Sequence, residues 1–132
     1  MVCDSGGAVD TAAHDRRAHQ DICQQHESEL YGAYNQLKTG LDQQDALAVA
    51  KAATVSTRLF LKANWNPFGS DLLALSEAMG WGICCAHSGT VFGILLTDRQ
   101  DVHRAWGACS RLVGEDALLG IYQLVPGGIR YV

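Results

Sequence analysis

The sequence predicts an α+β fold, in which a mostly antiparallel sheet of about four strands carries helices packed on one face. Three segments show the apolar periodicity of helices, and two continuous apolar runs, 82–86 and 91–96, are separated only by residues 87–90. So short a link indicates an antiparallel hairpin, because a parallel pair needs a crossover of about a dozen residues or more. With 132 residues and no evident linker or repeat, the chain is expected to form one domain, 1–132.

Composition favours a globular protein and argues against several other classes. Hydrophobic residues make up 48% of the chain and charged residues 18%, so there is enough apolar surface for a packed core. The formal net charge of −4 argues against nucleic-acid binding, which needs a basic surface. No apolar run approaches the roughly 20 residues of a membrane span, and the first residues lack the features of a secretory signal. We therefore expect a cytoplasmic protein whose five cysteines are free thiols.

The N-terminal third is expected to begin with a short strand and to continue as helix. Residues 1–4 suit a short strand, and residues 5–7, which include two glycines, suit a turn. The polar stretch 12–25 is expected to be a short helix or an exposed connection. A clearer amphipathic helix follows, with Gly40 near its end. Its apolar face comprises Leu30, Ala33, Tyr34, Leu37 and Leu41.

Two further helices are expected before the hairpin. Residues 45–62 carry only a thin stripe of basic side chains, so this helix should be mostly buried. Residues 64–69 interrupt the periodicity and are expected to form a loop. Ser70 is then placed to cap the next helix. The apolar face of that helix comprises Leu72, Leu75 and Met79, and Gly80 ends it.

The second half of the chain is expected to supply most of the sheet. The runs 82–86 and 91–96 are predicted to be its two central strands. Asp98 or Asp101 should cap the helix that follows. The inner face of this helix comprises Val102, Ala105, Trp106, Cys109 and Leu112. The last predicted segments are a strand over 119–125, a turn over 126–128 and a short edge strand over 129–132.

The link between the two apolar runs is the most informative feature for function. His87, Ser88, Gly89 and Thr90 place an imidazole, two hydroxyls and a glycine at one end of the sheet. Gly89 permits a positive φ and a close backbone approach. Successive N–H groups and hydroxyls in such a turn can bind phosphate or carboxylate oxygens. The alternative interpretation is a polar hairpin turn whose side chains satisfy their own backbone.

Other candidate sites carry weaker signals. Asp10 and Thr11 follow a glycine-rich turn, where they either contact a substrate or cap the next segment. The three histidines of the N-terminal stretch lack the i, i+4 spacing of a helical metal pair, and Cys85 with His87 supplies too few ligands for a zinc site. No metal site is therefore expected. The glycine-rich signatures of stand-alone nucleotide-binding loops do not occur, and the spacing suggests no Ser-His-Asp set.

Residues 86–91, Ala-His-Ser-Gly-Thr-Val, together with the apolar strand after them, resemble the third conserved motif of the GHMP kinases. This family is named after galactokinase, homoserine kinase, mevalonate kinase and phosphomevalonate kinase, and most members carry a Ser-Gly-Ser-Gly-Pro type of loop here. The version with a histidine is similar to one branch, the L-threonine kinases of cobalamin synthesis and propanediol utilisation. Segments 4–7, 9–11, 16–17 and 126–129 also resemble that branch, so the resemblance extends along nearly the whole chain.

The resemblance implies the C-terminal half of an ATP-dependent kinase with a ferredoxin-like core, which phosphorylates the hydroxyl of L-threonine to give O-phospho-L-threonine. ATP and Mg²⁺ are implied for the intact enzyme. The family's phosphate-binding loop and an acidic catalytic residue belong to an N-terminal half that this sequence lacks, so the fragment is expected to be inactive alone. It is expected to associate with that half or with a second copy. The resemblance makes residues 87–90 the wall near nucleotide and substrate, makes Asp10 and Thr11 candidate substrate contacts, and identifies no catalytic residue.

Two alternatives stay open at the level of sequence. The chain could be a non-catalytic α+β module for ligand binding or oligomerisation, since small α+β domains serve such roles. It could also come from a GHMP kinase for another small alcohol, such as homoserine or mevalonate. In each case a small molecule or a protein is the expected partner, and neither a nucleic acid nor a membrane.

Overall fold

A four-stranded antiparallel sheet organises the part of the chain that the computed structural model describes, residues 1–7, 16–86 and 88–123. The strands stand in the order β2-β3-β1-β4, and every neighbouring pair is antiparallel. They are β1 (Val2–Asp4), β2 (Gly82–Cys85), β3 (Val91–Leu95) and β4 (Leu118–Gly120). The predicted α+β class and the 87–90 hairpin connection are confirmed. The prediction that both apolar runs are central strands is wrong for β2, because β1 pairs with β3 and leaves β2 at the edge.

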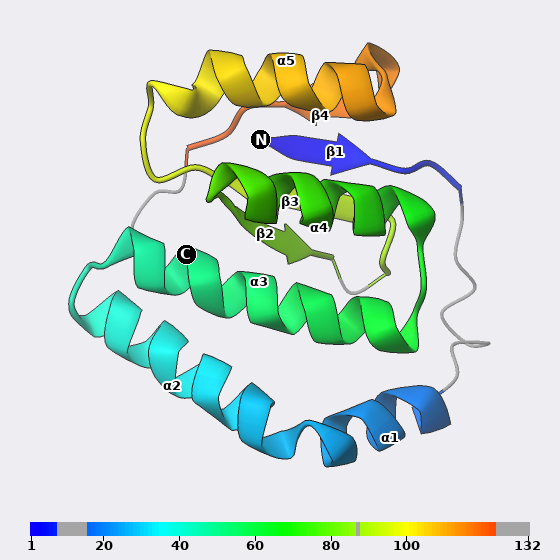
Figure 1. Cartoon of the computed structure of the whole chain (residues 1–132), viewed down its shortest axis with the longest axis vertical. Coiled ribbons are helices and arrows are strands. Elements are labelled where there is room, and N and C mark those ends of the chain that lie inside the picture. The colour runs from blue at the N-terminus through cyan, green and yellow to red at the C-terminus, as the bar shows by residue number, and fades with distance from the viewer. Residues whose placement is uncertain (8–15, 87, 124–132) are drawn as a thin grey trace, which may run out of the picture.

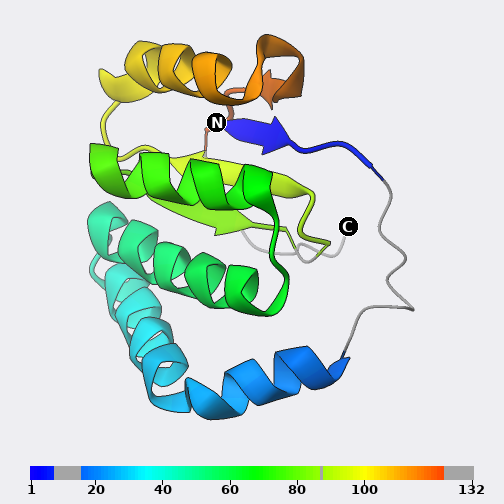
Figure 2. The same ribbon diagram turned by 45° about the vertical axis from the view of Figure 1, so that its right-hand side comes forward.

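The helices lie over one face of this sheet and beyond its β2 edge (Figures 1 and 2). They are α1 (Arg16–Gln25), α2 (Glu27–Asp42), α3 (Ala46–Ala63), α4 (Pro67–Met79) and α5 (Asp101–Val113), with a short 3-10 turn at Glu115–Ala117. Helices α4 and α5 cover one face of the sheet, as predicted, whereas α3 lies beside β2 and α2 packs on the far side of α3. None of the described helices combines the length and the apolar character needed to cross a bilayer.

Helix α3 protects the open edge of β2 with two buried threonines. The Oγ1 atom of Thr54 accepts a hydrogen bond from Ile83 N (3.1 Å) and donates one to Ala50 O (2.9 Å), and Thr57 Oγ1 donates to Ile83 O (3.1 Å). An edge strand otherwise exposes such backbone groups to another chain. The approach is close, because a Cβ at Gly82 would lie 2.6 Å from the Cβ of Ala50. Edge pairing at β2 is therefore replaced by side-chain hydrogen bonds from α3.

The core lies between the sheet and helices α3, α4 and α5. Alternate residues of the strands point into it, as the period of two along a strand requires. Its most buried members are Cys3, Ile83, Phe92, Ile94, Leu61, Leu72, Ala105 and Cys109. On α5 the predicted inner face is right for Ala105 and Cys109, whereas Leu112 is 43% exposed. The opposite face of the sheet carries the alternate residues, among them Cys84 and Gly93.

Two predicted helix starts are wrong. Helix α4 begins at Pro67, inside the segment expected to be a loop, and its cap is Asn66 rather than Ser70. The Oδ1 atom of Asn66 accepts from Gly69 N (3.2 Å), and proline suits the first helical position because its missing N–H would have no partner there. Helix α5 has Gln100 at its N-cap, and Asp98 accepts from Gln100 N in the preceding turn. The ends of other helices follow prediction, with Asp45 capping α3.

The predicted apolar face of α2 is only partly buried. Ala33 is buried and Leu30 and Leu37 are half-buried, as predicted. Gly40 is also buried, and a Cβ there would lie 3.0 Å from the Cβ of Ala48 on α3. Tyr34 and Leu41 are 61% and 62% exposed. At Gly40 the two helices approach so closely that a larger residue would not fit.

Residues 16–25 of the stretch 12–25 form α1, and residues 12–15 lie outside the described residues. The strand predicted over 119–125 is wrong for residues 121–123, because β4 ends at Gly120. The turn and strand predicted over 126–132 lie outside the described residues.

Candidate functional site

The 86–90 hairpin turn is a tight structure packed against the end of α3. Ala86 N donates to Val91 O (2.8 Å), and Gly89 N donates back to Ala86 O (2.8 Å). Gly89 has a φ of +73°, and a Cβ there would lie 2.9 Å from the ring of Phe60. Both features require glycine, because other residues are strained at this φ and have no room. The turn is thus fixed in shape by its own backbone and by α3.

Asn66 ties this turn to the first turn of α4. Its Nδ2 donates to Gly89 O (3.1 Å), while its Oδ1 accepts from Gly69 N and caps the helix. The Asn66 side chain therefore links the hairpin turn to the first turn of α4. The sequence analysis assigned residues 64–69 to a loop and missed this role; an Asn directly before a Pro is the local signal that indicates it.

The turn also meets the end of β1. Ser5 N (2.8 Å) and Ser5 Oγ (3.0 Å) both donate to Thr90 O. Asp4 Oδ1 accepts from Gly6 N (2.9 Å), which shapes the glycine-containing turn that follows β1. Residues 4–7 and 88–90, more than eighty positions apart in sequence, are therefore neighbours at one end of the sheet.

Two hydroxyls of the turn keep hydrogen-bonding capacity. Ser88 Oγ and Thr90 Oγ1 lie 3.0 Å apart in a mutual hydrogen bond, and both residues are half-buried. One O–H donates within the pair, so one O–H donor and several lone pairs stay unused by this bond. The backbone carbonyls of Gly89 and Thr90 are already occupied by Asn66 and Ser5. The arrangement suits a small polar group at the hydroxyl pair. His87, Asp10 and Thr11, the other candidate site residues, lie outside the described residues.

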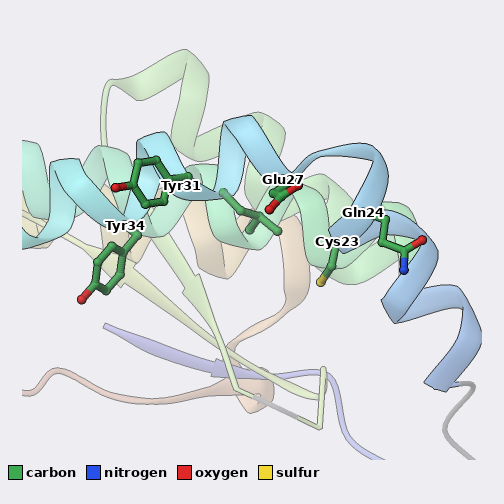
Figure 3. A pocket seen from close by; sticks show the side chains of 6 residues that line it. Cys23, Gln24, Glu27, Tyr31 and Tyr34 are labelled. Carbon is green, nitrogen blue, oxygen red and sulfur yellow. The ribbon is translucent and has the colours of Figure 1, made fainter.

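A shallow hollow of about 470 Å³ lies along α1 and α2, away from the hairpin. It is lined by Cys23, Gln24, Glu27, Leu30, Tyr31 and Tyr34. Figure 3 shows the two tyrosines on α2, and Cys23 and Gln24 on α1. Its surface is mainly aromatic and aliphatic, and it is suited to contact rather than to acid–base chemistry. Sequence reasoning placed Tyr34 on the buried face and so missed it.

A second hollow of about 370 Å³ lies between α3, the end of α4 and the start of β2. Its polar feature is the ion pair of Arg58 with Glu77, in which Nη2 and Nε lie 2.6 Å and 3.2 Å from Oε1. Lys51 and Trp81 also line it. Trp81 is largely buried, and its indole N–H has no partner among the described residues. Neither hollow includes a residue of the 86–90 turn.

The thiols on β2 are poor nucleophiles. Burial raises the pKa of Cys85 to about 11, and burial also raises the pKa of Cys84. A thiol with a raised pKa is protonated at neutral pH and unreactive, because the thiolate is the nucleophile and the metal ligand. Within residues 1–7, 16–86 and 88–123, no group of three or more His, Cys, Asp or Glu side chains is arranged to hold a metal ion.

Comparison with known proteins adds no assignment. No family model matches the sequence, and neither the curated proteins nor the solved structures contain a significant match. The functional argument therefore depends on the residues of this chain and their geometry.

Proposed function

We propose that this chain is the C-terminal, substrate-side portion of a GHMP-type kinase that phosphorylates the hydroxyl of L-threonine. Turnover also requires the N-terminal half typical of the family, which binds ATP and Mg²⁺. A cytoplasmic location is part of the same proposal. The observation that carries the proposal is the pair of hydrogen bonds from Ser5 to Thr90 O. These bonds bring together residues 4–7 and 88–90, which belong to two of the segments whose sequences resemble the L-threonine kinase branch.

The strand order is the second support. The chain runs β1, helices, β2, β3, helix, β4, and the sheet order is β2-β3-β1-β4. Strands β1 and β2 are parallel to each other, and β3 lies between them, antiparallel to both. This arrangement is the split β-α-β unit of ferredoxin-like folds. The resemblance implied such a core. This agreement in strand order supports the family assignment. It does not indicate the activity, which has to be argued from the site.

The described residues of the turn offer groups that can hold a small polar substrate. Phosphoryl transfer needs groups that position the substrate and neutralise the phosphates. Ser88 and Thr90 offer a hydroxyl pair that can bind the carboxylate or hydroxyl of a small amino acid. The family resemblance assigns ATP and Mg²⁺ to the N-terminal half, and we keep that assignment in the proposal. The chemistry supplied by ATP is the transferred phosphoryl group, and this chain's part is to orient the acceptor.

An NMR titration of the isolated chain tests the substrate assignment. Adding L-threonine should shift the amide signals of Ser88, Gly89 and Thr90 saturably, and Thr90→Val should weaken the apparent affinity about tenfold, as expected for loss of one hydrogen bond to a charged ligand. Thr97→Val, an exposed threonine beyond β3, is the matched control and should leave binding unchanged. Homoserine and mevalonate, run in parallel, identify a kinase for another alcohol. Absence of any shift at the turn with all three ligands contradicts the proposal.

One observation favours a second candidate, a non-catalytic ligand-binding or oligomerisation module. The carbonyls of the turn are satisfied by Asn66 and Ser5, whereas Tyr31 and Tyr34 are exposed beside the hollow on α2. Exposed aromatic side chains of this kind are enriched at protein interfaces. In this case sedimentation should show a concentration-dependent oligomer that Tyr34→Ala abolishes, while L-threonine leaves the turn signals unmoved. A monomer at all concentrations rules out the oligomerisation form of this candidate.

A further inference from the structure

A glutamate, a histidine and a lysine form a hydrogen-bonded row on the surface beside α2 and α3. His26 lies between α1 and α2, at the N-cap of α2. Its Nδ1 atom lies 3.1 Å from Oε2 of Glu29 on α2, and its Nε2 atom lies 3.4 Å from Nζ of Lys62 in the last turn of α3. Glu29 and Lys62 are exposed and the His26 side chain is 26% exposed, so a small molecule in solution can reach the row. None of the three belongs to the 86–90 turn or to either hollow.

The two partners of His26 determine which of its nitrogens carries the proton. An ionised carboxylate can only accept a hydrogen bond, and an ammonium group can only donate one. Nδ1 therefore carries the hydrogen that it donates to Glu29, and Nε2 accepts a hydrogen bond from Lys62. In this arrangement the imidazole is neutral, and its basic nitrogen faces the lysine amine.

Arg58 of α3 holds the carboxylate at the other end of the row. Its Nη1 atom lies 3.9 Å from Oε1 of Glu29, and its Nη2 atom lies 2.6 Å from Oε1 of Glu77 on α4. Glu29 therefore directs one oxygen toward Arg58 and the other toward His26. A nucleophile, a base within reach of it and a carboxylate that orients the base are the parts from which covalent catalysis is built.

We propose that Lys62 is a site of self-catalysed acylation by a small acyl phosphate, with His26 as the general base. The Lys62 ammonium group transfers one proton to Nε2 of His26, and the free amine attacks the acyl carbon. The new N–C bond forms, and the C–O bond to the phosphate breaks. The phosphate leaves with a second proton from the nitrogen, and His26 passes its proton to water. The products are an amide at Lys62, hydrogen phosphate and one proton, so atoms and charges balance.

The other lysines of the chain, Lys38 and Lys51, lack this arrangement. Lys38 lies on α2 and Lys51 on α3, and both are exposed, as Lys62 is. Neither is hydrogen-bonded to a histidine within the described part of the chain. Accessibility alone therefore predicts similar reaction rates at the three lysines, whereas base catalysis predicts a faster reaction at Lys62.

Acylation should weaken the connection between α3 and the corner that joins α1 to α2. The amide has no positive charge, so Lys62 loses the charge-assisted hydrogen bond that it donates to His26. Arg58 and its bonds to Glu29 and Glu77 are left in place. The modification is therefore expected to act on the α1–α2 corner and to leave the sheet and the 86–90 turn unchanged.

Peptide mapping by mass spectrometry of the full chain with its natural sequence tests the proposal directly. The chain is incubated with acetyl phosphate at neutral pH, samples are quenched over time, and hydroxylamine removes any thioesters before digestion. We expect Lys62 to be acetylated about tenfold faster than Lys38 and Lys51. This is less than the roughly 10²–10⁴ of general-base catalysis in an active site, because the Nζ–Nε2 separation of 3.4 Å is long. Equal rates at the three lysines, or a faster reaction at Lys38 or Lys51, overturn the proposal.

Matched histidine variants separate base catalysis from positioning of the lysine. His26→Gln supplies an amide oxygen that can accept from Lys62 but no basic nitrogen, so the Lys62 rate should fall to that of Lys51. His103→Gln, at an exposed histidine of α5, is the control and should leave the Lys62 rate unchanged. A fast reaction at Lys62 that persists in His26→Gln, or that His103→Gln removes, contradicts the assignment. Both substitutions lie at the surface, so both variants are expected to fold, and circular dichroism checks this.

Discussion

The sheet layer and the outer helix α2 are packed by opposite means. In the sheet layer the large side chains are inside, and Phe92 and Ile83 are 0% exposed. On α2 the buried residues are small, namely Ala33 and Gly40, and Gly40 lies close to α3, while Tyr34 is 61% exposed. The two regions therefore suit different roles. The sheet layer fixes the geometry of the hairpin turn, whereas α2 exposes aromatic side chains and contributes no large side chain to the core.

The largest expected effect is a difference in stability between a substitution in the sheet layer and one on α2. Phe92→Ala removes a fully buried ring that packs against Phe68, and should lower the free energy of unfolding by about 3–5 kcal/mol. Tyr34→Ala, on the exposed face of α2, should change it by less than about 0.5 kcal/mol. Urea unfolding followed by circular dichroism measures both. Equal losses in the two variants contradict the comparison.

The next effect concerns the hairpin turn itself. Gly89→Ala should suffer the strain of a positive φ, about 1 kcal/mol, and in addition a collision with the Phe60 ring of about 1–3 kcal/mol. Gly80→Ala is the matched control, because its φ is +71° and nothing lies within 4 Å of the added Cβ. The difference in urea midpoint between the variants measures the packing of the turn against α3. Identical midpoints would show that α3 does not hold the turn.

A smaller effect should come from Asn66. Asn66→Ala removes both the cap of α4 and the hydrogen bond to Gly89 O, and should cost about 1–2 kcal/mol. Asn66→Asp keeps the capping oxygen and loses the Nδ2 donor, so its loss should be intermediate. Thermal unfolding ranks the three proteins. If Asn66→Asp equals Asn66→Ala, the cap contributes nothing and the role assigned to this residue is wrong.

The smallest effect is a pH dependence that originates on β2. The folded chain holds the pKa of Cys85 near 11, above its ordinary value of 9.0, because burial disfavours the thiolate. Between about pH 9 and pH 11 the unfolded chain loses this proton and the folded chain keeps it, so stability falls as pH rises through that window. Cys85→Ser should flatten this part of the stability profile. A profile unchanged by the substitution contradicts the buried-thiol assignment.

Most of the fold could be predicted from local patterns in the sequence. Asp45 before an apolar helix, Gly80 after one, and the two apolar runs around residues 87–90 all produced the elements they indicate. The errors have a common physical cause, which is that periodicity reports apolar faces but not which neighbour they meet. Tyr34 and Leu41 lie on a periodic apolar stripe yet are exposed, whereas α3 approaches α2 closely at Gly40, a residue outside that stripe.

The sequence predicted the position of the candidate turn but not the hydrogen bonds that join it to other elements. The sequence indicated a polar turn with a glycine at 89, and the positive φ there is as expected. The hydrogen bonds from Asn66 and Ser5 to that turn join residues more than twenty and more than eighty positions apart, and no local pattern contains such pairings.

The central claim, that this chain orients the acceptor for a kinase completed by another half, is tested most directly by reconstitution. The chain is mixed with the ATP-binding N-terminal half of an L-threonine kinase, MgATP and L-threonine, and phosphorus NMR follows the products. We predict O-phospho-L-threonine in the mixture and none from either part alone, with Thr90→Val reducing the rate and Thr97→Val leaving it unchanged. Turnover by this chain alone, or a mixture that hydrolyses ATP without forming phosphothreonine, would contradict the claim.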